Sequence, residues 1–92
     1  DGAEAERMGL VNRCVERDQV VPTALEMAHA IARCAPIAVR GTKQALHRSM
    51  AATLESQLEF EAEQQAICYE SADFAEGLRA IREKRAPRFE GR

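Results

Sequence analysis

Apolar residues recur every three or four positions along most of this chain, which is the spacing of one face of an α-helix. The first such stripe joins Val21, Leu25, Ala28, Ala32 and Ala35. Of the residues, 46% are hydrophobic but only 4% are aromatic, so the core is expected to use small and aliphatic side chains. Such side chains favour packed helices over a sandwich or barrel. The predicted fold class is therefore all-α, with one exception near the N-terminus.

Proline and capping residues predict where the first helices begin and end. Pro22 suits the first turn of a helix that runs to about Cys34, and Pro36 breaks that helix and begins a second one, to about Met50. Thr53 is the expected N-cap of a third helix, and its apolar residues lie on two sides, which predicts more than one packing partner.

The last helix is predicted from the Asp73-Phe74-Ala75-Glu76 sequence, which has the spacing of a capping box. In that arrangement the Asp73 carboxylate accepts the Glu76 N–H, and the Glu76 side chain reaches back to the Asp73 N–H. The helix is expected to end near Lys84 or Arg85, ahead of Pro87.

Residues 1–20 depart from the helical pattern. A short helix is expected to end near Met8, with Gly9 in the left-handed conformation that closes many helices. The segment 10–15 then alternates apolar and polar side chains after Leu10, which is typical of a short strand. A lone strand needs neighbours, so its partner strands are expected in sequence upstream of Asp1.

The sequence shows no catalytic or metal-binding arrangement. His29 and His47 lie on different predicted helices at no ligand spacing, and the serines lack a glycine-rich elbow. The three cysteines are odd in number and widely spaced, and they are expected to be buried, reduced thiols. No apolar run approaches the roughly 20 residues of a membrane span. We expect a soluble, cytoplasmic protein without a metal ion or a separate cofactor.

Charge is distributed unevenly. No Lys or Arg lies between Arg48 and Arg79, whereas the last fourteen residues carry six basic side chains against Glu83 and Glu90. A basic tail can meet phosphates, although a run of charge is more often a solvated face. The acidic balance and the lack of interleaved aromatic residues argue against nucleic acid.

Three stretches of the sequence resemble the crotonase family, the enoyl-CoA hydratases and isomerases, and specifically its C-terminal third. They are Ala3–Asn12, Ala35–Ala38 with Lys43, and Asp73–Gly91. The resemblance implies a spiral catalytic core that ends within residues 1–20, followed by a helical oligomerisation and CoA-pocket module over residues 21–92. It also implies a homo-oligomer based on trimers, with an acyl-CoA as the substrate.

The oxyanion hole and the acidic residues of the family lie upstream of these helices, so the resemblance implies no catalytic residue here. It does imply that Lys84 contacts the phosphates of coenzyme A. Ile81 falls where many members have Phe beside the adenine or acyl tail, which makes it an apolar wall of the pocket. The competing interpretation of Lys84 is a cation that stabilises the negative end of a helix.

Three functions stay open at this point. The chain is the C-terminal part of an enzyme acting on acyl-CoA thioesters, or a stand-alone helical interaction module derived from that family, without catalysis. The third and weakest interpretation is an unrelated helical binding domain.

Overall fold

The computed structural model describes all 92 residues and contains helices but no strand. The α-helices are α1 (Gly2–Arg7), α2 (Val20–Ala32), α3 (Pro36–Ser49), α4 (Leu54–Glu70) and α5 (Ala72–Glu83). A short 3-10 helix, η1 (Arg17–Gln19), precedes α2. The all-α prediction is confirmed, and the predicted helix boundaries agree with the observed ones to within about two residues.

The strand predicted over residues 10–15 is wrong, because α1 takes the hydrogen bonds that a strand would need. The N–H groups of Leu10 and Val11 both donate to the Ala5 carbonyl, and the Cys14 N–H donates to the Glu6 carboxylate at 2.8 Å. Gly9 has a φ of 75°, as expected of a residue that closes a helix. The segment thus folds back on α1 instead of extending toward a partner strand.

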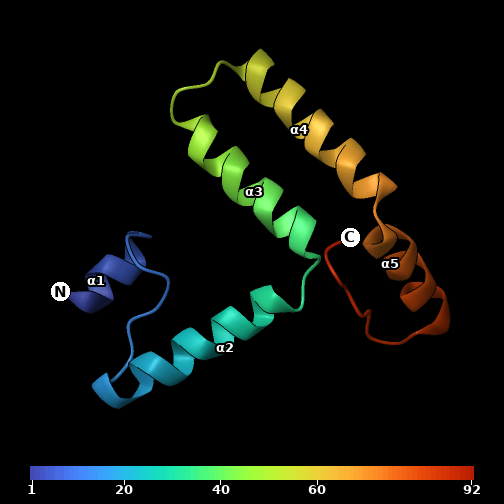
Figure 1. Ribbon diagram of the computed structural model, residues 1–92. Helices are drawn as coiled ribbons and strands as arrows, with labels where there is room; N and C mark the ends of the chain where they lie inside the picture. The colour runs from blue at the N-terminus through green and yellow to red at the C-terminus, as the bar shows by residue number, and fades with distance from the viewer.

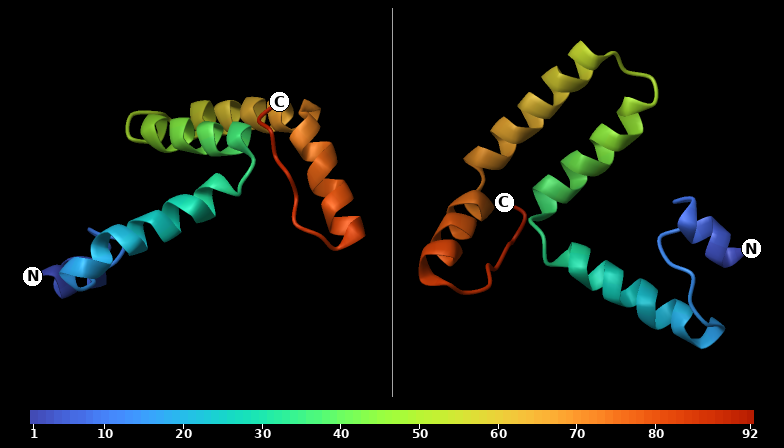
Figure 2. Two further views of the ribbon diagram at one scale, coloured as in Figure 1. Left: turned by 60° about the horizontal axis from the view of Figure 1, so that its bottom comes forward. Right: turned by 180° about the vertical axis from the view of Figure 1, so that it is seen from behind.

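The helices form an open, flat arrangement. Helices α3 and α4 lie side by side as an antiparallel hairpin, α2 leads away from the start of α3, and α5 turns off the end of α4 (Figures 1 and 2). The radius of gyration is 16.9 Å and the molecule measures 45 × 38 × 18 Å. A compact domain of this length has a radius of gyration of about 12 Å, so the chain does not close around a core of its own.

Three kinds of contact between α3 and α4 hold the hairpin together. Gly41 is buried in α3, where an added Cβ would lie 3.1 Å from Oε1 of Gln64 on α4. The Gln57 side chain of α4 donates to the Ala45 carbonyl of α3 at 3.2 Å. The guanidinium of Arg48 lies 4.4 Å from the centre of the Phe60 ring, a cation–π contact between the same two helices.

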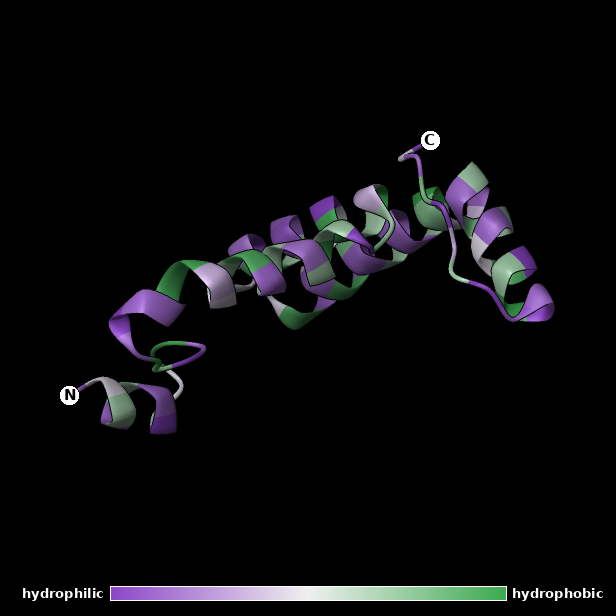
Figure 3. Cartoon of the chain, turned by 90° about the horizontal axis from the view of Figure 1, so that it is seen from below, coloured by the Kyte–Doolittle hydropathy of each residue, from purple (hydrophilic) through white to green (hydrophobic).

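Many large apolar side chains remain exposed. Figure 3 shows hydrophobic and hydrophilic residues interspersed along the helices. Only Gly41, Asp73 and Ala80 are buried. The prediction that the cysteines are buried is wrong for Cys14 and Cys34, which are exposed, because so little of the chain has an interior; all three thiols are free. The apolar surface is available for contacts with other protein.

Candidate functional site at the end of α5

The last eight residues of the chain, Arg85–Arg92, form a tail that folds back along α5 toward the start of α3 (Figure 1). Two carboxylates of α5 hold it, and we call Asp73 and Glu76 the carboxylate clasp. The Asp73 carboxylate accepts the N–H of Glu90 at 2.7 Å and that of Gly91 at 2.8 Å. Asp73 is only 3% exposed, so both bonds are shielded from water.

The second carboxylate of the clasp binds the beginning of the tail. The Glu76 carboxylate accepts hydrogen bonds from both terminal nitrogens of Arg85, at 2.6 and 3.0 Å, and from the backbone N–H of Arg88 at 3.0 Å. The hydrogen bond from Arg85, reinforced by that from the Arg88 backbone, lowers the pKa of Glu76 to about 2. The same pairing with Glu76, followed by that with Glu83, raises the pKa of Arg85.

The capping box predicted for Asp73 and Glu76 is therefore wrong. Helix α5 begins at Ala72, and its N-cap is Ser71, whose hydroxyl oxygen accepts the Phe74 N–H at 3.2 Å. With the N-cap satisfied two residues earlier, both carboxylates are free to bind the tail. The tail also passes Gly77 of α5, where an added Cβ would lie 3.7 Å from the Phe89 ring.

Lys84 stands at the point where the chain reverses from α5 into the tail. The Lys84 N–H donates to the Ile81 carbonyl and the Arg85 N–H to the Ala80 carbonyl, which is the Schellman arrangement of a helix end. That arrangement needs a left-handed residue, usually Gly, and Lys84 takes it with φ 52° and ψ 42°. A side chain in this conformation costs roughly 1 to 2 kcal/mol.

The basic side chains of this region divide into paired and unpaired groups. Arg79, Arg85 and Arg92 form ion pairs with Glu76, Glu83 or Glu90. Arg82, Lys84 and Arg88 have no ion-pair partner within the chain. Ile81, the other predicted contact, lies on α5 three residues before Lys84 and is 76% exposed. The turn therefore presents an unpaired cation and an open apolar side chain in the same stretch of chain.

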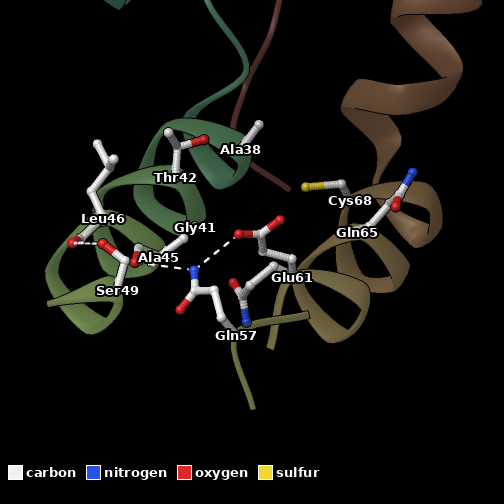
Figure 4. A pocket seen from close by; sticks show the side chains of 11 residues that line it. Ala38, Gly41, Thr42, Ala45, Leu46, Ser49, Gln57, Glu61, Gln65 and Cys68 are labelled. Carbon is white, nitrogen blue, oxygen red and sulfur yellow. Dashed lines mark hydrogen bonds between the residues drawn. The ribbon is translucent and has the colours of Figure 1, made fainter. Parts of the chain in front are cut away.

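Apart from this turn, a hollow lies between α3 and α4, with a volume of about 440 Å³ (Figure 4). Two of its polar side chains form hydrogen bonds inside the chain: the Ser49 hydroxyl donates to the Leu46 carbonyl at 2.8 Å, and the Gln57 amide nitrogen donates to Glu61 at 2.9 Å. The Gln57 side-chain oxygen is buried without a hydrogen-bond partner. No histidine borders the hollow, so Ser49 has no imidazole to activate it. This hollow contains no arrangement for nucleophilic catalysis.

Three further observations concern the rest of the chain. No three residues among His, Cys, Asp and Glu approach one another closely enough to bind a metal ion. None of the helices has the length and apolar character needed to cross a bilayer. Lys43 lies with Arg40, His47 and Arg48 beside Phe60 along α3 and forms no ion pair.

The fold and the turn define a helical segment whose last helix ends in a cation without an ion-pair partner, and comparison with known proteins gives the family. The family model described as Enoyl-CoA hydratase/isomerase matches residues 1–92. The chain therefore belongs to the enoyl-CoA hydratase/isomerase family, which confirms the resemblance to crotonases.

Individual relatives show how much of a family member this chain represents. It is 40% identical over 82 residues to the short-chain-enoyl-CoA hydratase of Clostridium acetobutylicum, covering 89% of this chain and 31% of that protein. It is 42% identical over 89 residues to the mevalonyl-coenzyme A hydratase of Aspergillus fumigatus, with 95% and 33% covered. The crystal structure of an enoyl-CoA hydratase from Bacillus anthracis superimposes with a TM-score of 0.91 and 34% identity, over 98% of this chain and 35% of that one. The chain thus spans about a third of the length of its relatives.

Proposed function

We propose that this chain is the C-terminal part of an enoyl-CoA hydratase/isomerase-family enzyme that acts on acyl-CoA thioesters. Residues 1–20 would be the end of its catalytic core, and residues 21–92 a module for oligomerisation and for closing the substrate pocket. The match over the whole chain, combined with coverage of only a third of each relative, supports this proposal. In this proposal the chain supplies no catalytic residue, and coenzyme A enters as part of the substrate.

The observation that carries the substrate contact is the conformation of Lys84. A position that normally takes Gly holds a lysine in the left-handed region, and its ammonium has no ion-pair partner in the chain. Backbone strain of this kind persists at sites where the side chain is needed. Lys84 would bind a phosphate of coenzyme A as a point charge, and Ile81 would form an apolar wall nearby.

Exposed apolar surface supports the oligomerisation role. Large apolar side chains at the outer end of the α3–α4 hairpin are far from buried: Leu46 is 65% exposed, Met50 88% and Leu54 71%. A patch of this kind usually belongs against other protein. The catalytic core and sister subunits would cover it.

A chimera tests the proposed function. The part of this chain that matches the Clostridium acetobutylicum hydratase over 82 residues replaces the corresponding segment of that enzyme. The rate of crotonyl-CoA hydration by the chimera is compared with that of the unmodified enzyme. We expect a folded oligomer with hydratase activity. A chimera that folds and oligomerises but does not hydrate crotonyl-CoA would contradict the proposal and favour a stand-alone interaction module.

A further inference from the structure

The ion pair between Glu76 and Arg85 is placed directly beside the strained turn. Arg85 follows Lys84 in the chain, and its guanidinium binds Glu76 through two hydrogen bonds of 2.6 and 3.0 Å. Its backbone N–H closes the Schellman arrangement on Ala80. One residue therefore fixes the turn through its backbone and ties the turn to α5 through its side chain.

The ion pairs of Arg85 hold Lys84 in its strained left-handed conformation. Without other contacts, Lys84 would relax out of the left-handed region, which is unfavourable for a residue with a Cβ. To do so it would have to displace Arg85, which is paired with both Glu76 and Glu83. Bidentate, charge-assisted bonds of this type are the stronger and more directional hydrogen bonds of proteins. The side chain of Glu76 is only 16% exposed, which limits screening by water.

The ion pairs of Arg85 also determine which basic side chains remain free to bind a ligand. Arg85 engages two carboxylates of α5, that of Glu76 and that of Glu83, which directly precedes Lys84 in the chain. Without Arg85, either carboxylate could attract the Lys84 ammonium and neutralise it. The arrangement keeps Lys84 without an internal partner.

We propose that Glu76 and Arg85 are positioning residues that fix the Lys84 turn and keep the Lys84 ammonium available for a phosphate of coenzyme A. This inference rests on the proposed function. It assigns to Glu76 a role in substrate binding that passes through Arg85 and Lys84, without contact between Glu76 and the substrate.

The test is a double-mutant cycle in the chimera. Glu76→Gln removes the ion pair at nearly constant size, and we expect it to raise KM for crotonyl-CoA about fivefold with kcat unchanged, the result of lost uniform binding. In a Lys84→Ala background the same substitution should change KM by less than about 1.5-fold, because interacting residues are not additive. Arg85→Gln should behave like Glu76→Gln, and Arg85→Lys, which retains a charge for Glu76, should recover part of the loss.

A matched control is the Glu4–Arg7 pair of α1, which has the same chemistry at 2.6 and 2.9 Å but is distant in sequence from the turn. Glu4→Gln should leave KM unchanged. If the Glu76 and Lys84 effects add fully, or if Glu76→Gln lowers kcat and leaves KM alone, the positioning role is overturned while the proposed function stands.

If the chimera is inactive, titration of coenzyme A into the isotopically labelled 92-residue chain still decides the question. Weaker binding by Glu76→Gln than by the unchanged chain, together with loss of the Lys84 response, would support the positioning role without turnover. Binding of coenzyme A by Glu76→Gln as tight as by the unchanged chain, with the Lys84 response retained, would overturn the positioning role.

Discussion

The carboxylate of Asp73 accepts the backbone N–H of Gly91, eighteen positions further along the chain, at 2.8 Å. Its other oxygen accepts the neighbouring Glu90 N–H at 2.7 Å. Because both donors belong to the backbone, the Glu90 carboxylate remains free to pair with Arg92. Asp73 therefore holds the end of the tail, at Glu90 and Gly91, whereas Glu76 holds its beginning, at Arg85 and Arg88.

Asp73→Asn should release the end of the tail. The amide keeps one acceptor oxygen but turns two donors toward N–H groups that are also donors, and hydrogen bonds to a charged group contribute about 1.5 to 3 kcal/mol each. We expect protection of the Glu90 and Gly91 amides against hydrogen exchange to fall by at least about tenfold. Asp18→Asn, at an exposed position of η1, serves as the control and should leave both amides unchanged. Undiminished protection in Asp73→Asn would show that the tail is held by other contacts.

Glu76 makes the beginning of the tail sensitive to acid. Its pKa is lowered from 4.5 to about 2, so the folded state binds this proton less readily than the unfolded chain does. The stabilisation is therefore complete above about pH 4.5 and is lost as the pH falls toward 2. The amide resonance of Arg88, which donates to Glu76, should titrate in the NMR spectrum with a midpoint near 2. Glu76→Gln should abolish that titration, and a midpoint near 4.5 would mean that the ion pair does not form in solution.

Lys84→Gly separates the two roles discussed for this residue, because glycine adopts the left-handed conformation without strain. We expect the substitution to stabilise the helix end by about 1 kcal/mol and yet to raise KM of the chimera several-fold at low salt, with kcat nearly unchanged. The rise in KM should shrink at high ionic strength, since exposed charges are screened. Thermal unfolding and steady-state kinetics at two salt concentrations measure both effects. An unchanged KM would leave Lys84 as a cation that only stabilises the helix end.

Alanine substitutions at Gly77 of α5 and at Gly91 of the tail should change the free energy of unfolding in opposite directions. At Gly77 an added Cβ would lie 3.7 Å from the Phe89 ring, an ordinary contact, so Gly77→Ala should stabilise the helix by about 0.5 to 1 kcal/mol. Gly91 has a φ of 77°, and its Cβ would lie 3.3 Å from Pro36, so Gly91→Ala should destabilise by about 1 to 2 kcal/mol. Urea unfolding of both variants checks the pair, and the same sign for both would contradict the described path of the tail.

Local sequence patterns were sufficient for most helix boundaries. Pro36 begins α3 because its missing N–H is not needed there, and Thr53 caps α4 by accepting the Ser56 N–H. These features depend on residues within one helical turn, so they can be recognised without knowledge of the fold. The wrong predictions share a different origin.

The role of Asp73 could not be predicted, because its partners lie 17 and 18 positions away and are backbone groups with no sequence signature. The spacing of Asp73 and Glu76 matched a capping box equally well, and Ser71, two residues earlier, was the signal that could have corrected the prediction. The predicted strand after Leu10 failed for a related reason. Alternation indicates which residues suit a strand, but pairing decides whether a strand forms, and here α1 accepts the available N–H groups.

The most direct test of the central claim is the rate of crotonyl-CoA hydration by the purified chain alone, measured beside a mock preparation. In the proposed function, the oxyanion hole and the proton-transferring acids belong to sequence outside these residues, and preorganised donors to a developing enolate oxygen are usually the largest single contribution to catalysis. We predict no rate above the mock preparation. Hydration clearly above it, retained through repeated purification, would contradict the account, because these 92 residues would then contain a catalytic site of their own.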